Sequence, residues 1–131
     1  MYKFLQMEQD ILKSFQKQFP YLEVAIKASI NLVQRVEREF TGVGAFASFY
    51  YENTEVLGNK TLAGKRYNSV IIKSKEFKHD CPVDIVFGKN GLIDYIELSM
   101  GLKKQKYPNE YEICYNEPNV VIDKGVKWKL L

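Results

Sequence analysis

The fold of this chain is decided by residues 36–48, which read Val-Glu-Arg-Glu-Phe-Thr-Gly-Val-Gly-Ala-Phe-Ala-Ser. Charged residues dominate the first part of this stretch, and small or apolar residues follow Thr41-Gly42. We predict a strand over residues 32–40 and another over residues 43–51, joined by a tight connection in which glycine takes a positive φ. A continuing helix over residues 32–40 is the alternative, because the apolar residues there fit both periods.

Small residues mark one face of the second of these strands as a close-packing surface. The residues on that face are Val43, Ala45, Ala47, Phe49 and Tyr51. Small side chains at Gly44, Ala45, Ala47 and Ser48 let another layer approach. We expect that layer to be helical, with a ligand or a partner as the alternative.

Two helices are predicted before this stretch. Apolar residues recur every three or four positions from Phe4 to Phe19, which is the spacing of one helix face. Pro20 ends this helix, because the residue before a proline is pushed out of the α region. A second helical pattern runs from Tyr21 to Asn31. Both helices would cover one face of a sheet.

The strongest local pattern lies at residues 83–98, where Asn90-Gly91 separates two β-prone runs. Asn-Gly in this position predicts a hairpin with a type I′ turn, which has positive φ at both central residues. With Lys89 opposite Leu92, the register gives four cross-strand pairs: Ile85 with Ile96, Val83 with Leu98, Val86 with Tyr95, and Asp84 with Glu97. The first two pairs are expected on the core face.

Weaker patterns complete the predicted sheet. Residues 52–68 lack periodicity and are interpreted as a surface loop, and residues 69–73 form a short strand. Residues 111–115 alternate as a strand, and residues 119–122 and 126–130 form a final hairpin. We therefore predict a single α+β domain, with two N-terminal helices packed on a mainly antiparallel sheet that has a C-terminal hairpin.

Composition excludes several classes of protein. The 131 residues suffice for one domain with a sizeable core, so residues 1–131 are treated as one unit. The net charge of +3 is too small for a nucleic-acid footprint. Two distant cysteines indicate reduced thiols, and no segment resembles a signal peptide or a membrane span. We expect a cytoplasmic protein that binds neither nucleic acid nor membrane.

The facing carboxylates Asp84 and Glu97 are the most informative polar pair. Like charges opposite each other destabilise a sheet unless something compensates them. Arg38 or Arg35 is the expected partner. Two alternatives stay open: an anionic patch for a basic partner, or a sheet-face pocket in which the carboxylates serve as acid and base or as ligands for a hard cation.

Other constellations are poor candidates for chemistry. His79 and Cys81 flank Asp80, but three consecutive residues on an extended segment cannot align a nucleophile, a base and an orienting group. Gly42-Val43-Gly44 lacks the rest of a phosphate loop. Aromatic residues in the strands leave RNA stacking as a minor alternative. We therefore expect no catalytic residue, no metal site and no cofactor.

The order of these features resembles a widespread group of small bacterial proteins. Their pattern runs approximately Arg-Glu-aromatic-Thr-Gly-Val-Gly-Phe-Phe, then a strand ending in Asp-Gly, then Leu-Glu-Gly-aromatic and Trp-Pro. The matching segments here are residues 38–46, Asn90-Gly91-Leu92-Ile93, Ile96-Glu97 and Tyr107-Pro108, so the likeness spans about residues 8–108. Three departures are Ala45 for an aromatic residue, Leu98 for a glycine, and about 23 residues after Pro108.

Several members of that group look like immunity proteins encoded beside polymorphic or contact-dependent growth-inhibition toxins. The resemblance implies a non-enzymatic inhibitor that binds and occludes a cognate toxin domain, for example a nuclease. It also implies a scaffold motif, and the positions carried over are Arg38, Glu39, Thr41, Gly42, Gly44 and Glu97.

Partner recognition is expected on loops and exposed strand faces, where charge complementarity and aromatic anchors act. Inhibitors of basic nucleases are often acidic, so local acidic patches are the best candidates in a chain of charge +3. The predicted partner-binding residues are Glu52, Glu55, Asp84, Glu97, Glu110 and Glu112. The alternative is an enzyme or small-ligand binder with a pocket around Asp84 and Glu97.

Overall fold

The computed structural model of the chain describes residues 3–52, 59–99 and 106–122. The helices within these ranges are α1 (Gln6–Gln18), η1 (Pro20–Leu22), α2 (Glu23–Leu32) and η2 (Lys60–Leu62), of which η1 and η2 are short 3₁₀ helices. The strands are β1 (Val33–Phe40), β2 (Ala45–Tyr51), β3 (Lys65–Lys73), β4 (Cys81–Phe87), β5 (Ile93–Leu98) and β6 (Glu112–Ile122). The predicted α+β class is confirmed.

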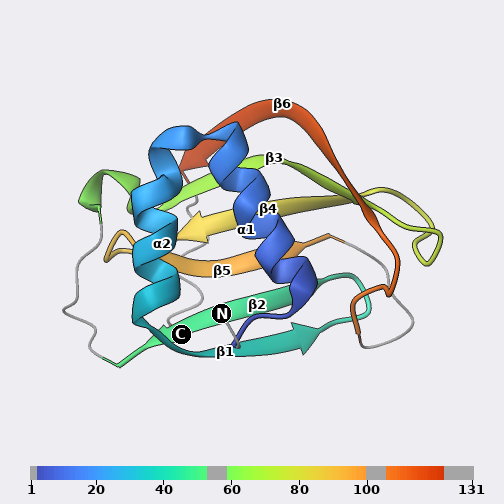
Figure 1. Ribbon diagram of the computed structural model, residues 1–131, viewed down its shortest axis with the longest axis horizontal. Coiled ribbons are helices and arrows are strands. Elements are labelled where there is room, and N and C mark those ends of the chain that lie inside the picture. Colours follow the sequence, from blue (N-terminus) through green and yellow to red (C-terminus); the bar gives the residue numbers. More distant parts are fainter. Residues whose placement is uncertain (1–2, 53–58, 100–105, 123–131) are drawn as a thin grey trace.

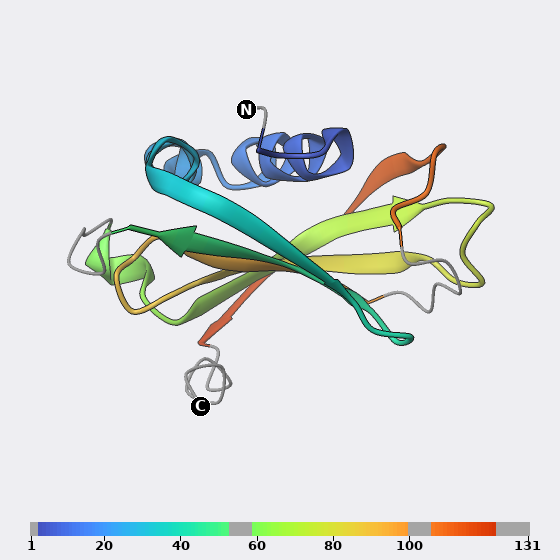
Figure 2. The same ribbon diagram turned by 90° about the horizontal axis from the view of Figure 1, so that it is seen from below.

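All six strands form one antiparallel sheet in the order β1-β2-β5-β4-β3-β6. Helices α1 and α2 lie side by side across one face of this sheet (Figure 1). Figure 2 views the sheet from its edge, and both α-helices lie on the same side of it. We call the side under the helices the helix face and the opposite side the outer face.

The two helices form where the apolar spacing predicts them. Helix α1 buries Ile11, Leu12 and Phe15 against the sheet, and it ends just before Pro20. Helix α2 is fixed by a side chain that the periodicity did not identify: the Ser29 hydroxyl donates to the Ala25 carbonyl at 2.8 Å and accepts from the backbone N–H of a β5 residue at 2.9 Å. Neither described α-helix combines the length and hydropathy of a membrane-crossing segment.

Strand β1 settles the ambiguity in favour of the extended form for residues 33–40, whereas Leu32 is the last residue of α2. Ala45, Ala47 and Phe49 of β2 are buried on the helix face, so the predicted close approach of the helix layer is confirmed. The aromatic rings of Phe49 and Phe4, which precedes α1, are 5.2 Å apart between centroids. Small alanine side chains on β2 therefore make room for helical side chains over the sheet.

The connection between β1 and β2 differs from the prediction. Among described residues, positive φ occurs only at Gly64 and Gly91, so Gly42 does not need its conformational freedom. The turn is held by Thr41, whose backbone N–H donates to the Gly44 carbonyl at 2.8 Å. Gly44 is the constrained position, because a β-carbon there would lie 2.7 Å from a backbone oxygen of β5. Glycine is required by a neighbouring strand rather than by the turn itself.

The β4–β5 hairpin confirms the predicted register. All four predicted pairs face each other, and the two pairs expected in the core lie in the buried cluster on the helix face. The turn type was wrong. Asn90 does not take a positive φ, and the turn is closed by the Gly91 N–H donating to the Gly88 carbonyl at 3.0 Å. A register shift between Val86 and Phe87 compensates for the different turn, so the pairs from Val83 with Leu98 to Val86 with Tyr95 stay as predicted.

Strand β3 is longer than predicted, and the loop prediction for residues 52–68 was wrong at its C-terminal end. The strand begins at Lys65 and shifts register between Asn68 and Val70, which breaks the alternation that identifies a strand in sequence. Helix η2 also lies within the predicted loop. Because β3 pairs with both β4 and β6, tertiary contacts order a segment whose local pattern is weak.

Strand β6 combines two strands that the sequence separated. Residues 112–115 and 119–122 both pair with β3, with a register shift between them. The predicted partner of the final hairpin, residues 126–130, lies outside the described residues. The two described cysteines are unpaired, as predicted.

Candidate protein-binding surface

The outer face of the sheet carries rows of polar side chains that cross several strands. The strand registers align Glu39 of β1, Phe46 of β2, Glu97 of β5 and Asp84 of β4 in one such row. Alternation along each strand places these side chains opposite the buried residues of the helix face. Three carboxylates from separate parts of the sequence therefore share one line across the sheet.

Arg66 of β3 compensates the pair formed by Asp84 and Glu97. Its Nη1 lies 2.5 Å from an oxygen of Asp84 and 3.2 Å from an oxygen of Glu97. Asn68 donates a further short hydrogen bond to Asp84. Burial opposes the charged form of Arg66, but the hydrogen bond to Asp84 and the surrounding charges outweigh it and raise the pKa of the guanidinium. The central carboxylates are thus held in a satisfied polar cluster.

The predicted compensation of these carboxylates by Arg38 or Arg35 was wrong, and strand geometry explains why. Arg38 pairs with Ala47 and points to the helix face, on the same side as its apolar neighbours on β1. Arg35 points outward but lies four residues before the β1 position that aligns with Glu97. Alternation along β1 could have excluded Arg38. Nothing local could have found Arg66, since it lies in the stretch interpreted as a loop.

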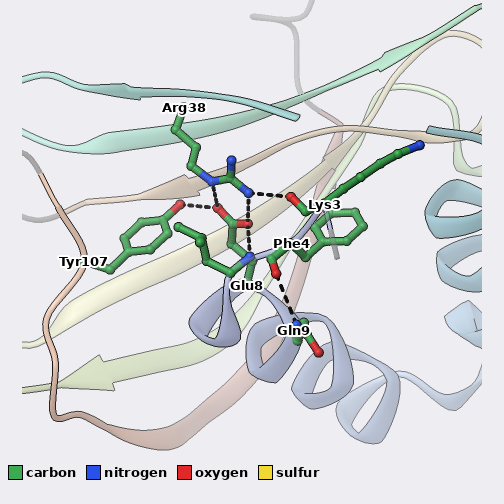
Figure 3. A network of polar contacts seen from close by, with 7 residues as sticks. Lys3, Phe4, Glu8, Gln9, Arg38 and Tyr107 are labelled. Carbon is green, nitrogen blue, oxygen red and sulfur yellow. Dashed lines mark hydrogen bonds and ion pairs between the residues drawn. The ribbon is translucent and has the colours of Figure 1, made fainter. Parts of the chain in front are cut away.

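Arg38 instead completes a buried network between β1 and α1 (Figure 3). Its Nη2 and Nε donate to the two oxygens of Glu8 at 2.6 and 2.7 Å, and Nη2 also donates to the Lys3 carbonyl at 2.8 Å. The Tyr107 hydroxyl donates to Glu8 at 2.7 Å. The hydrogen bond that Arg38 donates to Glu8 is the leading cause that raises the pKa of Arg38. The network joins the N-terminal segment, β1 and residue 107.

The motif carried over from the resemblance therefore divides into two parts. Arg38, Thr41 and Gly44 have structural contacts, in the buried network, in the turn and against β5. Gly42 is exposed, and a β-carbon there would meet nothing within 4 Å. Glu39 is an exposed carboxylate on the outer face. Glu97 is on the outer face as well, so two of the six carried-over positions lie there.

The part of the outer face formed by β1 and β2 is open to solvent and holds an ordered group of charged and aromatic side chains. Arg35 stacks on the Tyr50 ring, with its guanidinium carbon 4.3 Å from the ring centroid. Its Nε donates to Glu37 at 2.8 Å. Burial raises the pKa of Tyr50, and the charges of Glu37 and Asp94 add to this effect. We call Arg35, Glu37, Glu39 and Tyr50 the outer-face cluster.

The five described members of the predicted partner-binding set lie in three separate places. Asp84 and Glu97 lie in the Arg66 cluster, and Glu55 is outside the described residues. Glu52 follows β2 and accepts a hydrogen bond from Gln34. Glu110 and Glu112 line a surface hollow of about 470 Å³ at the start of β6. Arg35, Glu37 and Tyr50 were not among the predicted partner-binding residues, although β1 alternates clearly between charged and apolar residues.

The candidate nucleophile and base of the sequence, Cys81 and His79, lie in different environments. Cys81 is buried on the helix face, and burial raises the pKa of its thiol to about 12. His79 lies exposed in the connection before β4. No group of three or more histidine, cysteine or acidic residues within the described part of the chain is placed to hold a metal ion.

Comparison of the chain with protein-family models, with curated proteins and with solved structures finds no match.

Proposed function

We propose that this chain is an immunity-type protein that binds a toxin domain in the cytoplasm and neutralises it by occlusion, with the outer-face cluster meeting a basic surface of the toxin. The observation that carries the proposal is the sign of the local charge. The chain as a whole has a net charge of +3, yet the outer-face cluster has two exposed carboxylates, Glu37 and Glu39, and one cation, Arg35.

Charge of this kind suits a binding surface. Carboxylates on a solvent-exposed sheet face attract a basic protein over the Debye length of about 8 Å at physiological salt, and they raise the association rate more than they raise the affinity. Tyr50 supplies the amphipathic aromatic group that commonly anchors interfaces. The outer-face cluster thus combines steering charge with an aromatic contact.

The alternative function, an enzyme or small-ligand binder at Asp84 and Glu97, has weaker support. Arg66 and Asn68 already occupy oxygens of these carboxylates, so a substrate or cation would have to displace an ion pair. RNA binding is disfavoured by Glu37 and Glu39, because exposed carboxylates repel phosphate groups.

The test is a direct binding measurement with the protein encoded by the adjacent gene. The two purified proteins are combined and studied by calorimetry at two salt concentrations, and cells expressing the toxin domain are scored for protection. We expect a one-to-one complex that weakens with salt. If the proteins form no complex and cells are not protected, the proposal is wrong.

Two charge-reversal variants locate the surface. The first changes Glu37 and Glu39 to lysine, and the matched control changes Glu110 and Glu112 to lysine, so both carry the same change in net charge. We expect the first to weaken binding by about 100-fold, as expected when like charges face each other across an interface. The control should change the dissociation constant less than threefold, a range typical of charges outside an interface. The reverse result would move the interface to the hollow at the start of β6.

A further inference from the structure

Arg35 is an unexpected residue on a surface that should meet a basic partner. It is the cation of the outer-face cluster, it stands beside Glu37 and Tyr50, and about 60% of its side chain is exposed. A uniformly basic partner would be repelled by it. The presence of Arg35 therefore calls for a specific function in recognition.

The position of Arg35 is fixed more firmly than exposure alone would allow. Stacking on Tyr50 orients the plane of the guanidinium, and the bond from Nε to Glu37 orients its edge. An exposed ion pair and an exposed cation–π contact contribute little to stability. They do reduce the side-chain entropy that Arg35 would lose when a partner binds. The arrangement is a preorganised donor group.

The free edge of this group has the geometry of a carboxylate receptor. Among the described residues, Nε of Arg35 donates to Glu37, and no hydrogen bond from Nη1 or Nη2 to another described residue is present. The two terminal nitrogens of a guanidinium match the two oxygens of a carboxylate. A partner carboxylate could approach this edge while the ring of Tyr50 covers one face.

We propose that Arg35 is a specificity residue, which pairs with one carboxylate set within the basic surface of the toxin domain. This inference rests on the proposed function and narrows the partner to a surface of mixed charge pattern. A basic protein with no carboxylate at that point would bury Arg35 against like charge. The unfavourable free energy of this repulsion exceeds the favourable binding free energy of the remaining contacts. Arg35 thus selects against basic proteins in general.

The test compares Arg35→Ala and Arg35→Lys with a matched control, Lys89→Ala, which removes an exposed cation from the β4–β5 turn. With the toxin domain, Arg35→Ala should weaken binding about 30-fold, the size expected for an interface hot spot. Arg35→Lys should weaken it about tenfold, because an ammonium group keeps the charge but loses the planar fork. Lys89→Ala should stay within about twofold, the scatter of substitutions distant from an interface.

A second probe separates selection from a general structural effect. A fluorescently labelled decalysine peptide has basic charge and no side-chain carboxylate, so Arg35→Ala should bind it about threefold more tightly than the wild-type chain does, through loss of one repulsive charge. Opposite effects on the toxin domain and on decalysine support the inference. The inference is overturned if Arg35→Ala and the wild-type chain bind decalysine equally, or if Arg35→Ala binds both decalysine and the toxin domain more weakly than the wild-type chain does.

The failure of this inference can be told apart from failure of the proposed function. A wild-type chain that binds the toxin domain while Arg35→Ala binds it equally well leaves the function in place and removes the role of Arg35. A wild-type chain that does not bind the toxin domain removes both.

Discussion

Replacement of Arg66 by methionine tests how the sheet tolerates two facing carboxylates. The change keeps most of the aliphatic stem of the side chain but removes the guanidinium that binds Asp84 and Glu97. The side chains of these residues are 20%, 18% and 26% exposed, so the cluster is largely but not fully buried. Breaking this cluster should therefore lower the free energy of unfolding by less than breaking a wholly buried ion pair would.

The magnitude follows from that burial. Removing one partner of a buried pair costs about 3–5 kcal/mol, whereas exposed pairs contribute about 0–1 kcal/mol. We expect Arg66→Met to lower the free energy of unfolding by about 3 kcal/mol at pH 7, which corresponds to a fall in Tm of about 10 °C for a domain of this size. About half of the loss should come from repulsion between the two carboxylates left facing each other, and the rest from the lost hydrogen bonds of Arg66.

Urea unfolding followed by far-ultraviolet circular dichroism provides the measurement. In the Arg66→Met background, changing Asp84 to asparagine and Glu97 to glutamine removes the repulsion and should restore about half of the loss.

Arg38→Met is the matched control, because it removes a guanidinium from the other face of the sheet. It should be destabilising as well, but substitution of Asp84 and Glu97 should not rescue it. The reasoning is refuted if Arg66→Met unfolds at the same urea concentration as the wild-type chain, or if removal of the two carboxylates gives no recovery.

Three further predictions concern the interior. Glu8 accepts four hydrogen bonds and is fully buried, so Glu8→Ala should cost about 3–5 kcal/mol in urea unfolding; a cost below about 1 kcal/mol would show that the network contributes little. Gly91→Ala should lower the free energy of unfolding by about 2–4 kcal/mol, because φ is +76° and a β-carbon would lie 2.2 Å from a backbone oxygen. Gly42→Ala is the control and should change the free energy of unfolding by less than about 0.5 kcal/mol, because a β-carbon there meets nothing within 4 Å. A thiol reagent at pH 8 should modify Cys114 while leaving Cys81 protected until the chain unfolds, since burial raises the pKa of Cys81 to about 12; equally fast labelling of both in the folded protein would contradict this.

Prediction from sequence succeeded where the residues of one short segment determine its local structure. The helix at residues 6–18 and the pairing of Val83 with Leu98 both followed from periodicity and from a turn between adjacent strands. The turn type at Asn90 was wrong because turns of different length can join the same register. The register survived this error, since facing apolar residues determine it more strongly than the turn does.

Prediction failed where a segment depends on distant neighbours. Strand β3 contains a register shift, so its sequence lacks the regular alternation of a strand. Its hydrogen bonds come from the neighbouring strands β4 and β6, which are distant in sequence. Arg66 was missed for this reason. The outer-face cluster was not among the predicted partner-binding residues, because Arg35 was expected to compensate Asp84 and Glu97, and Glu39 was expected to belong to the scaffold.

The sequence alone determined that Asp84 and Glu97 face each other, because the hairpin register follows from adjacent residues, and it favoured a cation as their compensation. Only the tertiary structure decided which cation does so. Strand order brings Arg66 beside β4, and alternation along β1 directs Arg38 to the helix face. Which residues face each other in a hairpin is a local property of the sequence. Which strand lies next to that hairpin in the sheet depends on how the whole chain packs.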